Sequence, residues 1–125
     1  MHLLHLGLPM NGERRSRRFY EAYFGFEPAT ARRYDDGTVI IRNADDFDIA
    51  LHPTDVIERL PAFLRFGFKV RDAVAVRALL ARLKADGVHI VEEFDEPAYV
   101  GFKCLDPDGF SVEIDLLRAS LTASD

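Results

Sequence analysis

Hydrophobic and polar residues alternate over much of this chain, in short runs that end near glycine, proline or aspartate. The run Phe110–Leu116 is typical: its apolar residues share one face of a strand, while Ser111, Glu113 and Asp115 share the other. Two longer segments instead carry apolar residues at helical spacing. We predict helices at 12–24 and 73–86, and strands at 3–10, 26–34, 38–43, 47–52, 63–70, 88–94, 99–105 and 110–116.

The predicted elements occur twice in the same order, one strand, one helix and three strands. Asn11 and Asp72 precede the two helices as candidate caps, and a glycine follows each helix. We therefore predict a single domain with an α+β fold, in which tandem βαβββ modules form a curved mixed sheet around a concave cavity. The first module spans 3–52, a linker 53–62, the second module 63–117 and a flexible tail 118–125.

One face of each predicted sheet carries polar groups beside small or aromatic ones. The side chains of His5, Arg65 and Glu113 fall on this face of their strands, and we expect them to converge on the concave surface. Phe63 and His52 fall on the same faces. A polar face is also the ordinary water-facing side of an antiparallel sheet, so the pattern alone leaves both interpretations open. The residues expected beneath the helices are Leu4, Leu6, Phe66, Phe68, Val112 and Ile114.

Composition excludes several classes of function. The chain has 125 residues, 48% of them hydrophobic, which suits one globular domain. The net charge of −5 argues against a nucleic-acid binder, and no apolar run reaches the roughly 20 residues that span a membrane. We expect no signal peptide at the N-terminus. The single cysteine, Cys104, predicts a buried thiol in a reducing compartment, and we expect a cytoplasmic protein.

Three stretches of the chain carry a resemblance to a known family. "HLGLPM" near the start, "RFYEAYFGFE" at the end of the first helix and "LDPDGFSVEIDL" near the C-terminus fall in the order of the repeated modules. Together they resemble the vicinal oxygen chelate superfamily, the group of glyoxalase I, bleomycin resistance proteins, fosfomycin resistance proteins and extradiol dioxygenases. The likeness covers about Leu3 to Leu117 and does not choose among these functions.

The resemblance implies metal ligands on the first and last strands of the modules. His5 and Glu113 match two of these positions and suit Mn, Fe, Ni or Zn. Arg65 and Ala50 stand where two further ligands are expected, and neither has a lone pair to donate. His52, Asp48 or Asp115 are alternatives for a third ligand.

We therefore favour a metal-independent small-molecule binder, similar to the sequestering drug-resistance members of the superfamily. Arg65 and Glu113 are expected to form an ion pair, with Phe63 and either Tyr99 or Phe102 lining the site. The acidic runs 45–48 and 92–96 suit a cationic ligand, whereas Arg65 suits an anionic group.

Two other functions stay open. The first is a divalent-metal-dependent lyase, isomerase or dioxygenase that uses His5 and Glu113, so that the sequence does not decide whether the protein is an enzyme. The second is an interaction module without a ligand. We also expect a homodimer, because uncovered sheet edges favour association.

Overall fold

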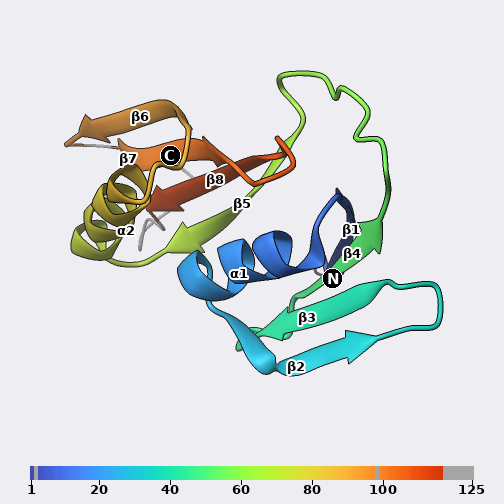
Figure 1. Cartoon of the computed structure of the whole chain (residues 1–125). Helices are drawn as coiled ribbons and strands as arrows, with labels where there is room; N and C mark the ends of the chain where they lie inside the picture. Colours follow the sequence, from blue (N-terminus) through green and yellow to red (C-terminus); the bar gives the residue numbers. More distant parts are fainter. Residues whose placement is uncertain (2, 98, 117–125) are drawn as a thin grey trace. The chain divides into compact units, whose positions relative to one another are not determined.

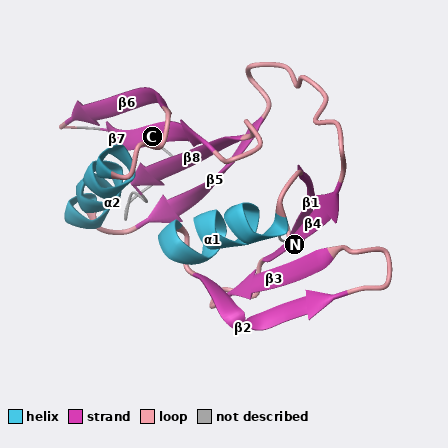
Figure 2. Cartoon of the chain, viewed as in Figure 1, coloured by secondary structure: helices cyan, strands magenta, loops and turns pink. Residues whose placement is uncertain are grey.

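The computed structural model describes residue 1, residues 3–97 and residues 99–116, which form eight strands and two helices (Figure 1). The order βαβββ occurs twice (Figure 2), which confirms the α+β class and the repeated module. The elements are β1 (His5–Met10), α1 (Glu13–Tyr23), β2 (Phe26–Arg33), β3 (Val39–Asn43), β4 (Asp48–Pro53), β5 (Arg65–Val70), α2 (Ala73–Ala85), β6 (Ile90–Glu96), β7 (Tyr99–Leu105) and β8 (Ser111–Leu116).

The chain divides into two compact units, residues 1–59 and residues 60–125. Each unit contains one four-stranded sheet and one helix. All strand pairings among the described residues join strands of the same unit. The tail predicted at 118–125 lies outside the described residues.

The first unit is a mixed sheet in the order β1-β4-β3-β2. Its first and last strands, β1 and β4, are parallel neighbours, and β3 and β2 continue the sheet antiparallel. Helix α1 packs against one face. Alternate strand residues and two aromatic residues of α1 form the core beneath it: Leu8, Met10, Val39, Ile41, Ile49, Leu51, Phe19 and Tyr20.

The second unit repeats this topology in the order β5-β8-β7-β6, with β5 and β8 parallel. Helix α2 packs against β5, β7 and β8. Each large apolar side chain buried here contributes roughly 1.5–3 kcal/mol to stability. The buried set comprises Val76, Leu83, Val100, Phe102, Cys104, Val112 and Ile114, so the predicted burial of the Cys104 thiol is confirmed.

The core prediction is confirmed only in part. Val112 and Ile114 are buried, whereas Leu6, Phe66 and Phe68 are only partly buried. Leu4 is 62% exposed, and its predicted burial is wrong, because β1 begins one residue later at His5. Both β1 and β5 lie at the edge of their sheets, where a side chain has a neighbouring strand on one side only.

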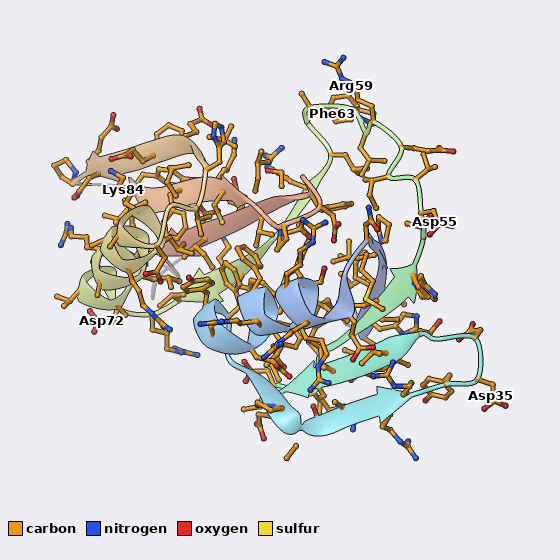
Figure 3. The ribbon with its side chains drawn as sticks, in the orientation of Figure 1. Asp35, Asp55, Arg59, Phe63, Asp72 and Lys84 are labelled. Atoms are coloured by element: carbon orange, nitrogen blue, oxygen red, sulfur yellow. The ribbon has the colours of Figure 1, made fainter. Side chains whose placement is uncertain are left out.

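The two helices begin differently. The carboxylate of Asp72 accepts a hydrogen bond of 2.9 Å from the backbone N–H of Val74, which confirms the predicted cap of α2. Figure 3 shows Asp72 at this end and Lys84 in the last turn, where a cation is favourable. The N-cap position of α1 is occupied by Gly12 rather than by the predicted Asn11, and glycine has no side chain that could cap the helix. Neither helix in the described part of the chain is long and apolar enough to cross a membrane.

Candidate functional site

The side of the second sheet opposite α2 carries mainly polar residues, and we call it the second polar face. Residues that are directly opposite each other on adjacent strands point to the same side of the sheet, so the residues of this face form rows that cross the strands. The face comprises Arg65, Gly67 and Lys69 of β5, Ser111, Glu113 and Asp115 of β8, Tyr99, Gly101 and Lys103 of β7, and Glu92 and Phe94 of β6.

Opposite charges alternate across the second polar face in a row of four side chains, one from each strand. Lys103 Nζ lies 2.6 Å from Glu92 Oε2 and 3.9 Å from Glu113 Oε1. Arg65 Nε lies 3.3 Å from the same Glu113 oxygen, and Arg65 Nη1 donates to the backbone carbonyl of Phe63 at 3.0 Å. The side chain of Glu113 is 20% exposed. Its carboxylate is therefore held between two cations in a partly buried position.

A second carboxylate, Asp115, is buried on the same face. Tyr99 Oη donates to Asp115 Oδ1 at 2.6 Å, and Lys69 Nζ lies 3.6 Å from Asp115 Oδ2. The hydrogen bond to Asp115, with a further contribution from burial, raises the pKa of Tyr99 to about 12. Gly101 lies beneath this carboxylate: a Cβ at position 101 would be 2.6 Å from Asp115 Oδ1 and 2.6 Å from the carbonyl oxygen of Ile114. Only glycine leaves room for Asp115 in this position.

The corresponding side of the first sheet, opposite α1, is the first polar face. Its central row contains Gly7, Ala50 and Ile40, which are register partners on three adjacent strands. Polar groups stand on either side of this row. The face comprises His5, Gly7 and Pro9 of β1, Asp48, Ala50 and His52 of β4, Ile40 and Arg42 of β3, and Thr38 directly before β3.

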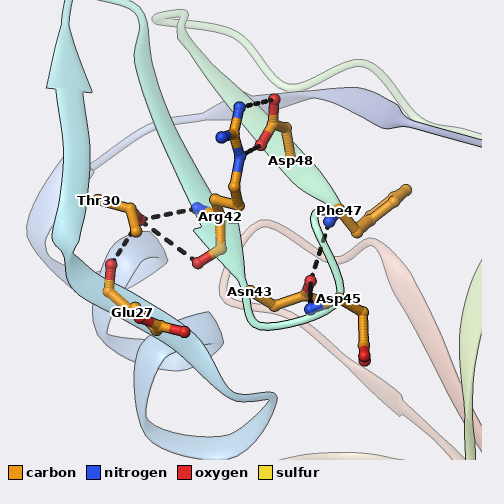
Figure 4. A network of polar contacts seen from close by, with 7 residues as sticks. All are labelled: Glu27, Thr30, Arg42, Asn43, Asp45, Phe47 and Asp48. Atoms are coloured by element: carbon orange, nitrogen blue, oxygen red, sulfur yellow. Dashed lines mark hydrogen bonds and ion pairs between the residues drawn. The ribbon is translucent and has the colours of Figure 1, made fainter.

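At one end of the first polar face, Arg42 and Asp48 form a two-point ion pair (Figure 4). Arg42 Nε lies 2.6 Å from Asp48 Oδ1, and Nη2 lies 3.2 Å from Oδ2. The hydrogen bond from Arg42 lowers the pKa of Asp48, and the charge of His5 contributes a smaller effect. His5 is the register partner of Asp48 on β1 and is exposed. The Asp48 carboxylate is thus already bound by a cation.

Two side chains shape the strands that carry this ion pair. Asn43 Oδ1 accepts hydrogen bonds from the backbone N–H groups of Asp45, at 3.0 Å, and Phe47, at 2.9 Å, and so closes the turn before Asp48. Thr30 lies where the pairing of β2 with β3 is irregular, and its hydroxyl accepts from the backbone N–H of Arg42 at 2.9 Å (Figure 4). These contacts fix the backbone from which Arg42 and Asp48 project.

At the other end of the first polar face, the imidazole of His52 extends over Gly7. His52 Nδ1 lies 3.1 Å from the hydroxyl oxygen of Thr38, which is a buried residue. A Cβ at position 7 would lie 3.3 Å from His52 Nε2 and 3.5 Å from Cδ2. The ring therefore has one nitrogen against the buried hydroxyl and the other directed toward the centre of the face.

The two polar faces have equivalent strand pairings, with a glycine at the centre of the first strand opposite the last strand in each unit. Gly7 pairs with Ala50 in the first unit, and Gly67 pairs with Glu113 at the equivalent place in the second. A Cβ at position 67 would lie 2.7 Å from the carbonyl oxygen of Glu113. The centre of the first strand is glycine in both modules, whereas the last strand has Ala50 in one and Glu113 in the other.

The side chains of these faces do not fit a conventional divalent-metal site within either unit. No three His, Cys, Asp or Glu side chains in the described ranges group as metal ligands. The carboxylate of Glu113 is held by Arg65 and Lys103, and that of Asp48 by Arg42. A catalytic divalent metal usually needs three protein ligands that are not already bound to cations.

The structure brings together part of the predicted site. Arg65 and Glu113 form the expected ion pair, and Phe63 joins them through its backbone carbonyl. His52 and His5 both lie on the first polar face. Convergence of His5 with Arg65 and Glu113 would join residues of different units, and it stays a prediction.

The sequence prediction of the second polar face omitted one residue, Lys103, and included one residue, Phe102, that lies on the opposite side of the sheet. Lys103 was not predicted, although alternation along β7 puts it on the same face as Tyr99 and opposite Phe102. Phe102 is 1% exposed and pairs with Ile114 in the core, so it does not line the polar face. Strand periodicity alone could have identified both positions.

The acidic run 92–96 is largely neutralised by neighbouring cations. In addition to Glu92, Glu93 lies 2.7 Å from Lys84 Nζ, and Asp95 lies 2.9 Å from Arg77 Nη2. These partners belong to α2, so the pairs tie β6 to the helix. The run therefore offers no evidence for a cationic ligand.

The sequence profile of the Glyoxalase/Bleomycin resistance protein/Dioxygenase superfamily matches residues 2–114. The chain belongs to this superfamily. The match covers both units of the fold and both polar faces. A comparison with curated proteins found no match.

Solved structures of superfamily proteins share the fold. A possible glyoxalase from Bacillus cereus is 25% identical, with a TM-score of 0.76 over 92% of this chain and 98% of that one. The fosfomycin resistance protein FosX from Listeria monocytogenes is 16% identical, with a TM-score of 0.79 over 95% of each chain. A mutant of FosX complexed with Mn(II) and 1S,2S-dihydroxypropylphosphonic acid is 17% identical, with a TM-score of 0.75 over 91% of this chain and 88% of that one. The FosX likenesses establish the fold alone.

Proposed function

We propose that this superfamily member binds a small molecule on its polar faces without a conventional metal site, as a sequestering or resistance-type protein. The observation that carries the proposal is the position of the Glu113 carboxylate between Arg65 and Lys103. Glu113 stands where the resemblance implies a metal ligand. Here its charge is already compensated within the sheet.

Electrostatics favours the metal-free function. Arg65 stays protonated at all relevant pH values and has no lone pair to coordinate a metal. A charge of +1 and a charge of +2 repel each other by about 2 kcal/mol at 4 Å, even with the dielectric constant of water. Because about 1.4 kcal/mol corresponds to a tenfold change in affinity, Arg65 alone should weaken metal binding to Glu113 by more than tenfold.

The charge balance of the faces supports a ligand without strong net charge. The four-residue row from Glu92 to Arg65 has a formal charge of zero, and so has the pair of Arg42 with Asp48. Aromatic surface lies nearby, since the rings of Phe94 and Tyr99 are 5.1 Å apart. Small-molecule sites typically combine apolar surface with a few placed polar groups.

The second candidate function is a divalent-metal-dependent lyase, isomerase or dioxygenase that uses His5 and Glu113. It is favoured by the likeness in fold to FosX, which is solved with Mn(II). Such an enzyme would require His5 and Glu113 to meet and would require Glu113 to leave its ion pairs.

We also propose that the protein is a homodimer. Three apolar residues in the sequence segment that links β4 to β5 are exposed: Val56 is 72% exposed, Phe63 76% and Leu64 43%. Figure 3 shows Phe63 on this segment. Exposed apolar surface of this kind favours association with a second copy of the chain. Sedimentation equilibrium measures the dimerisation, with Phe63→Ser compared against the wild type.

Calorimetric titration with Mn²⁺, Ni²⁺ and Zn²⁺ tests the metal-free function. We expect no tight binding by the wild type and a gain of more than tenfold in Arg65→His, which exchanges a cation for a neutral donor. Arg77→His is the matched control, because Arg77 pairs with Asp95 away from the polar face.

Two results would contradict this reasoning. Micromolar binding by the wild type that is lost in Glu113→Ala would overturn the metal-free function and favour the metal-dependent alternative. Equal affinities of Arg65→His and the wild type would show that His5 and Glu113 do not form a common site.

A further inference from the structure

The connection between β1 and α1 contains the sequence Asn11–Gly12. The carboxamide of an asparagine can be attacked by the backbone nitrogen of the next residue, and the attack closes a five-membered succinimide ring. Glycine in the next position favours this reaction, because it has no Cβ to crowd the nitrogen and its backbone rotates freely. Both residues are exposed, so water reaches the reacting atoms. The pair therefore has the chemical requirements of a deamidation site.

The backbone nitrogen of Gly12 differs from the glycine nitrogens at three comparable places in the chain. Aspartate forms the same succinimide, and it precedes glycine at 36–37, 86–87 and 108–109. In all three pairs the glycine N–H donates to a backbone carbonyl: Gly37 to Tyr34 at 2.9 Å, Gly87 to Lys84 at 3.1 Å and Gly109 to Asp106 at 3.0 Å. By contrast, none of the residues that the structure describes accepts a hydrogen bond from the N–H of Gly12. A nitrogen that is not held in a turn is available for attack on the preceding side chain.

The other side-chain carboxamide of the chain, Asn43, is held in place by the fold. The sequence contains two asparagines and no glutamine, so Asn11 and Asn43 are the only candidates for deamidation. Oδ1 of Asn43 accepts hydrogen bonds from the backbone N–H groups of Asp45 at 3.0 Å and Phe47 at 2.9 Å. Reaction at Asn43 would break both bonds and open the turn, and the next residue, Ala44, carries a Cβ. The folded protein thus protects Asn43.

We propose that Asn11–Gly12 is a modification site, at which the folded protein deamidates spontaneously to aspartate and isoaspartate. The Gly12 nitrogen loses its proton and bonds to Asn11 Cγ, and the carboxamide nitrogen takes up a proton and leaves as ammonia. Water then opens the succinimide at one of its two carbonyls. Cleavage between Cγ and nitrogen gives aspartate, and cleavage between the main-chain carbonyl and nitrogen gives isoaspartate. One water is consumed and one ammonia released, and the reaction does not depend on ligand binding by the polar faces.

The place of the site in the fold gives the modification a structural consequence. Met10, which precedes the pair, is 3% exposed and ends β1. The carbonyl of Gly12 accepts a hydrogen bond of 3.1 Å from the backbone N–H of Ser16 and so begins α1. Isoaspartate inserts one methylene into the backbone between these two fixed points, whereas aspartate leaves the backbone unchanged. Isoaspartate at position 11 should therefore lower the melting temperature of the protein.

Incubation of the whole protein at mildly alkaline pH in water enriched in heavy oxygen tests the proposal, with peptide mass spectrometry to locate the label. In the folded protein Asn11 should react at least about tenfold faster than Asn43, because two hydrogen bonds hold the Asn43 carboxamide. Isoaspartate should be absent from the three Asp–Gly pairs. In guanidinium chloride Asn43 and the Asp–Gly pairs should react faster than in the folded protein, while the rate at Asn11 changes little. Asn11→Gln is the matched control, because its longer side chain cannot close the five-membered ring.

Three results would overturn the inference or its consequence. Deamidation of Asn11 only in guanidinium chloride would show that the fold protects this residue as well. Isoaspartate at the Asp–Gly pairs of the folded protein, formed as fast as at position 11, would refute the role given to the free Gly12 N–H. The isolated isoaspartate form should melt below the Asn11→Asp variant, which carries the same added charge. Equal melting temperatures of the two would overturn the effect on the start of α1.

Discussion

Replacing Gly101 with alanine should destabilise the second unit strongly. The new Cβ would lie 2.6 Å from the carbonyl oxygen of Ile114 and 2.6 Å from Asp115 Oδ1. Ordinary contacts of a Cβ begin at about 3.4 Å. Gly101 lies on β7 and Ile114 on β8, and these strands pair with each other, so their backbones cannot move apart without breaking the hydrogen bonds between the strands.

The magnitude follows from two costs. Overpacking of this kind costs about 1–3 kcal/mol. Displacement of the Asp115 carboxylate also removes the hydrogen bond from Tyr99, and a bond to a charged group contributes about 1.5–3 kcal/mol. Because the surrounding structure can relax in part, we expect the free energy of unfolding to fall by about 3 kcal/mol. In a chain of this size, such a loss lowers the melting temperature by roughly 10 °C.

Gly7→Ala is the matched control for Gly101→Ala. Its Cβ would meet the His52 side chain at 3.3 Å, which can move, and no backbone atom within 4 Å. We expect it to cost less than about 1 kcal/mol. Guanidinium chloride unfolding with an unchanged m-value measures both variants. A loss below about 1 kcal/mol in Gly101→Ala, or equal losses in the two, would refute the argument from backbone crowding.

Three further results are expected. The pKa of Tyr99 in the folded protein is about 12, against an ordinary value of 10.0. Its contribution to stability is therefore complete below pH 10 and is lost as the pH rises toward 12. Urea unfolding across this range should show a decline in the free energy of unfolding that Tyr99→Phe lacks. Cys104 is 0% exposed, and burial raises the pKa of its thiol to about 12, so a thiol reagent should modify it only after unfolding, and rapid native-state modification would contradict its burial. Arg77→Gln should leave the melting temperature nearly unchanged, because Arg77 and Asp95 are both exposed and water screens their attraction; a clear drop in the melting temperature would give this pair a structural role.

Features that depend on neighbouring residues could be predicted from the sequence. Alternation gave β7 its observed bounds, Tyr99–Leu105, and assigned Val112 and Ile114 to the core. Alternation does not locate the ends of strands, because periodicity continues through Leu4 although the pairing of β1 begins at His5. Whether Asn11 caps a helix depends on backbone angles that its side chain does not determine.

The site required strand register, which periodicity does not supply. Lys103 and Glu113 become opposite residues only when β7 and β8 pair, and the turn between them leaves several registers open. The contact of Thr38 with His52 likewise depends on the pairing of β3 with β4. The pair of Arg65 with Glu113 was predicted because the family resemblance places both residues at positions of one ligand site.

The parallel pairing of first and last strands has a consequence for protein synthesis. Among the described strands β1 pairs with β4 alone, so His5 gains its partner Asp48 only after β4 has been synthesised, and Arg65 gains Ser111 only after β8 has been synthesised. Each sheet therefore closes late, through a non-local contact that is slow to form. The ribosome completes the first set of partners at Pro53, well before it reaches β5, so the leading half of the nascent chain can fold while the trailing half is still being made.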